Sequence, residues 1–74
     1  MELCDGTTGK TYRVSRIDLP ESLEKRLEAL GMIPGTEVTV LSRKGRGILI
    51  TKFRGTRFAL GTSVSGKIEV EACK

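Results

Sequence analysis

Apolar residues recur along this chain with two different spacings. Between residues 19 and 30 four leucines are separated by four, four and three positions, which places them on one face of an α-helix. Elsewhere apolar and polar residues alternate, as around Val38 and Val40, which is typical of short strands with one buried face. The pattern predicts one helix that stops at Gly31 and five strands, over residues 10–17, 37–42, 48–53, 57–60 and 68–70.

The segment that joins the helix to the second strand, residues 26–38, reads RLEALGMIPGTEV. Gly31 can adopt the left-handed backbone that closes a helix. Pro34 and Gly35 are typical of a type II turn, in which the glycine supplies the positive φ. Met32 and Ile33 are apolar although they lie in a connection, so we expect them to be buried. The segment is predicted to dock the helix onto the sheet.

Five short strands joined by hairpins, with one helix after the first strand, predict a mainly β fold. Asp18 is expected to cap that helix and Pro20 to lie in its first turn. A closed or half-closed barrel would hide strand edges that so small a sheet cannot otherwise cover. An SH3-like barrel fits the strand number and hairpin order best, and an OB-fold is the alternative. Residues 1–74 are expected to form one domain, because the length leaves no room for a second core.

Charge is distributed unevenly. The net charge is +4, but residues 39–67 contain seven basic and no acidic side chains, which gives +7, while the remainder holds six bases and nine acids, which gives −3. This polarity suggests an anionic partner such as an acidic protein, a nucleic acid or a lipid headgroup. The alternative is a solvated face of hairpin strands, where Lys and Arg discourage aggregation between edges.

The residues offer little catalytic or metal chemistry. The chain has no histidine, which removes the commonest general base and metal ligand. Cys4 and Cys73 are too few for a structural zinc site and are expected to be unpaired thiols in a reducing cytosol. Carboxylates near the N-terminus, such as Glu2 and Asp5, are expected to be solvated rather than to hold iron. The sequence predicts no enzyme, cofactor or metal, and the lack of a signal peptide or long apolar run predicts a soluble cytoplasmic protein.

Nucleic-acid binding remains an alternative. Small barrels bind single strands through a basic face with exposed aromatic side chains for stacking. The two aromatic residues of the basic half, Phe53 and Phe58, occupy positions that are predicted to face inward. Without an exposed aromatic, a basic hairpin gives only weak, salt-sensitive phosphate contacts.

Three stretches together resemble the FeoA family of small cytosolic proteins of ferrous iron uptake. They are the RLEALGMIPGTEV segment with the basic hairpin after it, RGTRFAL at residues 54–60, and IEV at residues 68–70. The resemblance covers roughly residues 6–71. A similar module forms the C-terminal domain of the DtxR-type metal-dependent repressors. The chain departs from the family at residues 61–66, GTSVSG, where many members have an arginine and an acidic, Ala-containing helical turn. Val64 is expected to take the place of the buried alanine.

The resemblance implies an SH3-like barrel with a binding role. Its implied partner is FeoB, a polytopic ferrous iron permease with a cytoplasmic GTPase domain. As an adaptor, the protein would receive a permease segment in a groove at the helix exit. Leu30, Met32, Ile33 and Pro34 would frame that groove, and Met32 and Pro34 are the surface candidates among these largely buried residues. Arg43, Lys44 and Arg46 would steer an acidic partner. The residues expected to bind are thus Leu30, Met32, Pro34, Arg43, Lys44 and Arg46.

Two further functions stay open. A GTPase regulator would insert an arginine at the nucleotide, and Arg46 and Arg54 are the best placed for this because both lie in loops. A stand-alone relative of the repressor's C-terminal barrel would instead contact a metal-sensing domain of another protein.

Overall fold

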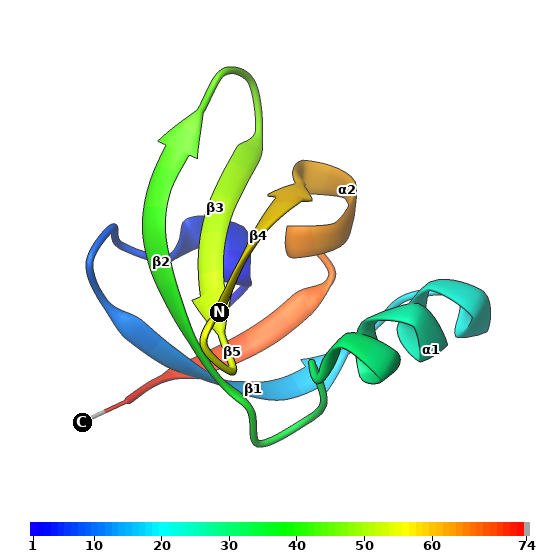
Figure 1. The fold of residues 1–74 in the computed structure, drawn as a ribbon. Helices are drawn as coiled ribbons and strands as arrows, with labels where there is room; N and C mark the ends of the chain where they lie inside the picture. Colours follow the sequence, from blue (N-terminus) through cyan, green and yellow to red (C-terminus); the bar gives the residue numbers. More distant parts are fainter. Residues whose placement is uncertain (74) are drawn as a thin grey trace.

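Five antiparallel strands and one ten-residue helix make up most of the chain (Figure 1). The computed structural model describes residues 1–73. A 3₁₀ turn, η1, spans Leu3–Asp5, and a four-residue helical turn, α2, spans Thr62–Ser65. The longer elements are β1 (Thr11–Ile17), α1 (Glu21–Leu30), β2 (Glu37–Lys44), β3 (Ile48–Phe53), β4 (Thr56–Gly61) and β5 (Ile68–Ala72).

The strands form one strongly curved sheet in the order β4-β3-β2-β1-β5, which is the predicted SH3-like barrel. Its two edges are β4 and β5, so the barrel is half-open by hydrogen bonding within residues 1–73. Register shifts after Val14 in β1 and after Val40 in β2 add the local twist that lets the sheet curl. The N-terminal segment covers part of the β5 edge, because Glu2 pairs with Glu69 and the Met1 carbonyl accepts from the Val70 amide.

The core is aliphatic, with one tyrosine and one fully buried phenylalanine. Val38 and Val40 face inward as predicted, and in β3 the inward face consists of Leu49, Thr51 and Phe53. The Phe53 ring stacks on Phe58 with centroids 4.3 Å apart. Both aromatic residues of the basic half therefore belong to packing, as the alternation predicts.

The N-terminal turn η1 contributes to the core, which the sequence pattern does not predict. Leu3 is completely buried although it stands in a polar, acidic segment. The turn places Leu3 against the barrel interior, while its neighbours Glu2 and Asp5 stay exposed. A single leucine carries no periodicity, so pattern analysis could not identify it.

Helix α1 begins later than predicted. Pro20 lies before the first helical residue, with φ −53° and ψ 146°, and its carbonyl accepts from the amides of Leu23 and Glu24. Asp18 makes no capping hydrogen bond; its amide instead donates to the Lys67 carbonyl and ties the chain to the barrel. The prediction of an Asp18 cap with Pro20 in the first turn is wrong, because the extended ψ of Pro20 delays the helix to Glu21.

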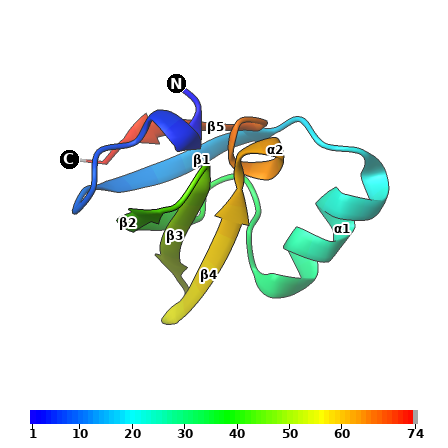
Figure 2. The same ribbon diagram turned by 90° about the horizontal axis from the view of Figure 1, so that it is seen from above.

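The helix lies beside the barrel rather than across its mouth (Figure 2). Of its leucine stripe only Leu27 is buried, and Leu23 and Leu30 are 38% and 46% exposed. Met32 is fully buried in the exit loop, but Ile33 beside it is 42% exposed. The sequence pattern predicts that the leucine stripe, Met32 and Ile33 plug one mouth of the barrel, and this prediction is wrong for Leu23, Leu30 and Ile33. No helix within residues 1–73 is long and apolar enough to cross a membrane.

Adjacent residues of the exit loop test this division between core and surface. We expect Met32→Ala to lower the free energy of unfolding by about 2–4 kcal/mol, because it empties a fully buried site. Ile33→Ala, its matched control, should cost less than about 1 kcal/mol, since that side chain is already solvated. Urea denaturation of both variants measures the difference, and equal losses would contradict the assignment.

Candidate functional site

The helix exit is held by a complete backbone hydrogen-bond pattern. Gly31 adopts the left-handed conformation, with φ 103°. Its amide donates to the Glu28 carbonyl at 2.9 Å, and the Met32 amide donates to the Leu27 carbonyl at 2.9 Å. This is a Schellman motif, whose usual apolar contact here joins the buried side chains of Met32 and Leu27 in the same core. Once Met32 enters the barrel, the next side chain must point outward.

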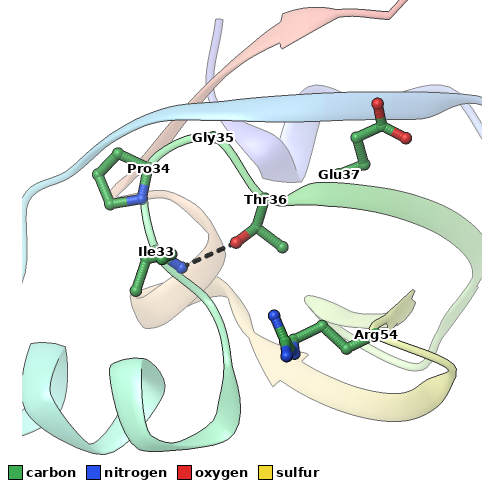
Figure 3. Close-up of a pocket in the computed structure, with 6 residues that line it drawn as sticks. All are labelled: Ile33, Pro34, Gly35, Thr36, Glu37 and Arg54. Carbon is green, nitrogen blue, oxygen red and sulfur yellow. Dashed lines mark hydrogen bonds between the residues drawn. The ribbon is translucent and has the colours of Figure 1, made fainter.

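The turn that follows is equally well fixed. The Thr36 amide donates to the Ile33 carbonyl at 3.0 Å across Pro34 and Gly35, and Gly35 has φ 97°, as the predicted type II turn requires. The Thr36 hydroxyl accepts from the Ile33 amide, drawn as a dashed line in Figure 3, and donates to the Gly31 carbonyl. The Gly35 amide also donates to the Val14 carbonyl of β1 at 2.7 Å. The loop therefore presents Ile33 and Pro34 in one conformation.

Two shallow grooves meet beside this loop. The first, about 460 Å³ in volume, runs along Ile33–Glu37 and reaches Arg54; its lining is drawn in Figure 3. The second, about 340 Å³, lies along the end of α1 and shares Ile33 and Arg54 with the first. We call Leu30, Ile33, Pro34 and Arg54 the helix-exit surface. It combines exposed aliphatic groups with one cation.

Arg54 reaches this surface from the turn between β3 and β4. It is the only residue other than glycine with a positive φ, 53°, among residues 1–73, and Gly55 follows with φ 78°. Since Phe53 pairs with Thr56, the two residues form a type I′ hairpin turn, which favours Asn-Gly over Arg-Gly. A left-handed arginine costs about 1 kcal/mol. The fold accepts that cost at one of the two described residues that line both grooves.

Gly31 makes room for the arginine stem. A Cβ at Gly31 would lie 2.1 Å from Arg54 Cδ and 2.8 Å from Arg54 Nε, so the stem occupies the space that a side chain would fill. Glycine is thus required here by its backbone conformation, and a side chain would in addition displace the flexible Arg54 stem. No ion pair joins Arg54 to a carboxylate among the described residues, which leaves its guanidinium donors free.

The structure groups only some of the predicted binding residues. Leu30 and Pro34 line the two grooves, and their role in binding stays a prediction. Met32 does not, because it is fully buried, and the expectation that it is a surface residue is wrong. The sequence suggests Ile33 as part of the frame of the groove but also predicts that it is buried, and it suggests Arg54 only for the GTPase hypothesis. A sequence signal for Arg54 does exist: the tight Arg-Gly turn requires a positive φ at the arginine, which is unusual for this residue type.

The predicted steering residues lie elsewhere. Arg43 and Lys44 end β2 and Arg46 lies in the turn after it, whereas the helix-exit surface adjoins the start of β2. A strand rises about 3.3 Å per residue, so the length of β2 separates the two sites by roughly 20 Å. Arg43 also donates to the Gly6 carbonyl and so has a structural role. The basic hairpin is not part of the groove.

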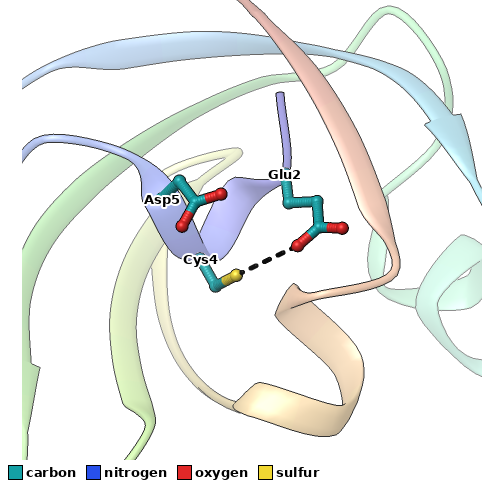
Figure 4. Close-up of side chains that lie close together, drawn as sticks. All are labelled: Glu2, Cys4 and Asp5. Carbon is teal, nitrogen blue, oxygen red and sulfur yellow. Dashed lines mark hydrogen bonds between the residues drawn. The ribbon is translucent and has the colours of Figure 1, made fainter.

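One cluster near the N-terminus could in principle hold a metal ion. The ligand atoms of Glu2, Cys4 and Asp5 lie within 4.8 Å of one another (Figure 4). The Cys4 thiol donates to a Glu2 carboxylate oxygen at 3.6 Å. Burial and then the nearby charge of Asp5 raise the pKa of Cys4, so its thiol stays protonated at neutral pH. Both carboxylates are solvent-exposed, as predicted, and Cys4 and Cys73 are unpaired thiols.

Residues 61–66 are small and polar apart from Val64, which predicts a loop or a 3₁₀ turn; they contain instead the α-helical turn α2. Val64 is half-buried against the core, and the Thr62 hydroxyl donates to the Gly47 carbonyl at 2.8 Å. The turn ties β4 to the basic hairpin without any charged residue.

Comparisons with known proteins place the fold and the family. A family model described as the FeoA domain matches residues 1–72. FeoA of Stenotrophomonas maltophilia, a prokaryotic SH3 domain protein solved in complex with zinc, superposes with a TM-score of 0.82 at 27% identity over 96% of this chain and 89% of that one. No curated protein matches.

Two longer chains contain the same fold. Iron(II) transport protein A of Clostridium thermocellum gives a TM-score of 0.88 at 24% identity; the match covers 97% of this chain and 45% of that one. A manganese-dependent transcriptional repressor gives 0.88 at 20% identity, with 99% and 41% covered. At these identities the likeness shows the fold alone.

Backbone strain at the β3–β4 turn can be measured directly. We expect Arg54→Asn to raise the free energy of unfolding by about 0.5 kcal/mol, because asparagine accepts the left-handed conformation more readily. Gly55→Ala should lower it by about 1 kcal/mol; a Cβ there would meet no atom within 4 Å, so the loss reports φ strain alone. A clear loss of stability in Arg54→Asn would instead assign Arg54 to holding the helix end.

The raised pKa of Cys4 predicts slow alkylation. In a Cys73→Ser background, iodoacetamide at pH 8 should modify Cys4 several-fold more slowly in the folded than in the denatured protein, because less thiolate is present. Adding Asp5→Asn should speed the reaction, since it removes a charge that raises this pKa. Mass spectrometry of timed samples gives both rates; equal folded and denatured rates would refute the assigned shift.

Proposed function

The chain belongs to the FeoA family of ferrous iron transport, and on that premise we propose that it is a non-catalytic partner of a FeoB-type permease. It works in the cytoplasm, where it binds the cytoplasmic, GTPase-bearing part of the permease. The contact is made by the helix-exit surface. This role needs no cofactor and no residue that reacts.

The observation that carries the proposal is the exposure of Leu30 and Ile33 on a hydrogen-bonded loop. The side chains of Leu30 and Ile33 are 46% and 42% exposed. The loop that carries Ile33 is held by four hydrogen bonds: three join Thr36 to Ile33 and Gly31, and one joins Gly35 to β1. Preorganised apolar groups lose little entropy on association and are typical anchors of interfaces. The core gains nothing from their position.

The GTPase regulator is retained as a second candidate, because Arg54 stands on the same surface with free guanidinium donors. An arginine supplied by a bound partner can stabilise the charge that develops during phosphoryl transfer. In that case docking would accelerate GTP hydrolysis; an adaptor would bind without changing the rate.

Calorimetric titration of the full chain into the GTPase-bearing part of the permease tests the proposal. We expect Ile33→Ser to weaken binding about tenfold or more. Ile48→Ser is the matched control, because Ile48 is 39% exposed on β3 beside the basic hairpin, and its affinity should equal that of the wild type. GTP hydrolysis measured in the same samples separates adaptor from regulator.

Two results would contradict the docking surface. If the wild-type chain did not bind the permease fragment, the proposed function would fail. If Ile33→Ser bound normally while Ile48→Ser bound weakly, the contact would belong to the basic hairpin instead.

A further inference from the structure

We propose that Arg54 is the specificity residue of the helix-exit surface and that its ligand is a carboxylate on an otherwise aliphatic segment of the partner. The inference rests on the proposed function and adds the chemistry of the segment that docks. Three observations support it: Arg54 lines both grooves, its backbone has a positive φ, and its guanidinium donors have no partner among the described residues.

The position of Arg54 is shared by both grooves. Apart from Ile33 it is the only residue that lines both, whereas Glu28 lines one and Glu37 the other. Glu37 is already paired, since its carboxylate lies 3.7 Å from an Arg13 nitrogen. A segment laid along the surface must therefore pass the guanidinium, whichever groove it follows.

The arginine stem lies over Gly31 while its head is free. Cδ and Nε occupy the space that a Cβ at Gly31 would fill, and Figure 3 shows the guanidinium directed toward the exit loop. No ion pair and no side-chain hydrogen bond engages it within residues 1–73. A positioned guanidinium offers parallel N–H donors that match the two oxygens of a carboxylate.

The backbone of Arg54 argues against a purely structural role. A type I′ turn is most stable with asparagine or glycine at this place, so the turn itself does not explain an arginine. The alternative is a helix-end cation, since α1 has no basic residue in its last turn. Lysine would serve a helix end as well as arginine does, but it cannot make a bidentate carboxylate contact, and this difference separates the two roles.

The charge and apolar atoms together select the ligand. Leu30, Ile33 and Pro34 line the same grooves as Arg54, so a docked aliphatic segment would exclude water from the ion pair and strengthen it. Glu28 and Glu37, which each line one groove, penalise additional acidic residues. The preferred segment therefore has aliphatic side chains with one Asp or Glu, rather than an acidic run.

A peptide library displayed on phage, with the full chain as bait, tests this chemistry independently of the permease. We expect the wild type to enrich peptides with a single Asp or Glu among aliphatic residues. The enrichment of acidic residues should disappear with Arg54→Gln. It should persist with Arg57→Gln, the matched control, which removes the same charge from an exposed arginine on β4. Enrichment of basic or purely apolar peptides, equal enrichment with Arg54→Gln, or no enrichment would overturn the proposal.

The same variants in the permease titration separate this inference from the proposed function. We expect Arg54→Gln and Arg54→Lys each to weaken binding about tenfold, with Arg57→Gln unchanged. If the wild type binds but Arg54→Lys binds equally well, the carboxylate assignment is wrong and the docking function stands. A dimer in sedimentation, or binding to phosphatidylglycerol vesicles, that is lost in Ile33→Ser would assign the surface to a second copy or to lipid and overturn the proposal.

Discussion

The left-handed glycine at the end of α1 is the constraint on which the arrangement of this molecule depends. Gly31 closes the helix, turns Met32 into the barrel and leaves Leu30 and Ile33 on either side of it in solvent. The same glycine leaves the space that the Arg54 stem occupies. One backbone conformation thus joins the helix to the core and forms the helix-exit surface. Any side chain at this position would adopt a strained φ and would displace the Arg54 stem.

The helix and the barrel have different roles. The barrel supplies the fixed frame, through long antiparallel ladders and an aliphatic core, and holds the exit loop by the hydrogen bonds of Gly35 to β1 and of Thr36 within the loop. The helix contributes only Leu27 to that core, so most of its apolar stripe is available for contact. A helix that is anchored at its end and exposed along its face is suited to binding another protein.

Much of the fold could be predicted from the sequence, because apolar residues alternate along most of the strands and the turns need glycine or proline at defined positions. The strand number, the inward face of β3, the Gly31 stop and the Pro34-Gly35 turn all follow from such local rules. The errors arose where tertiary contacts decide. A periodic stripe shows which leucines share a face, but not how far the helix stands from the barrel. Alternation likewise cannot say which of Met32 and Ile33 enters the core, and nothing in the local sequence marks Leu3 as buried.

The central claim is that the helix-exit surface is where the permease binds. The most direct measurement is amide chemical-shift mapping of the ¹⁵N-labelled full chain, with the GTPase-bearing part of the permease added in steps. The account predicts that the largest changes fall at Leu30, Ile33 and Thr36 and in the Arg54-Gly55 turn, which line or adjoin the two grooves. Changes confined to the basic hairpin at residues 43–48, or to the Glu2, Cys4 and Asp5 cluster, would contradict it.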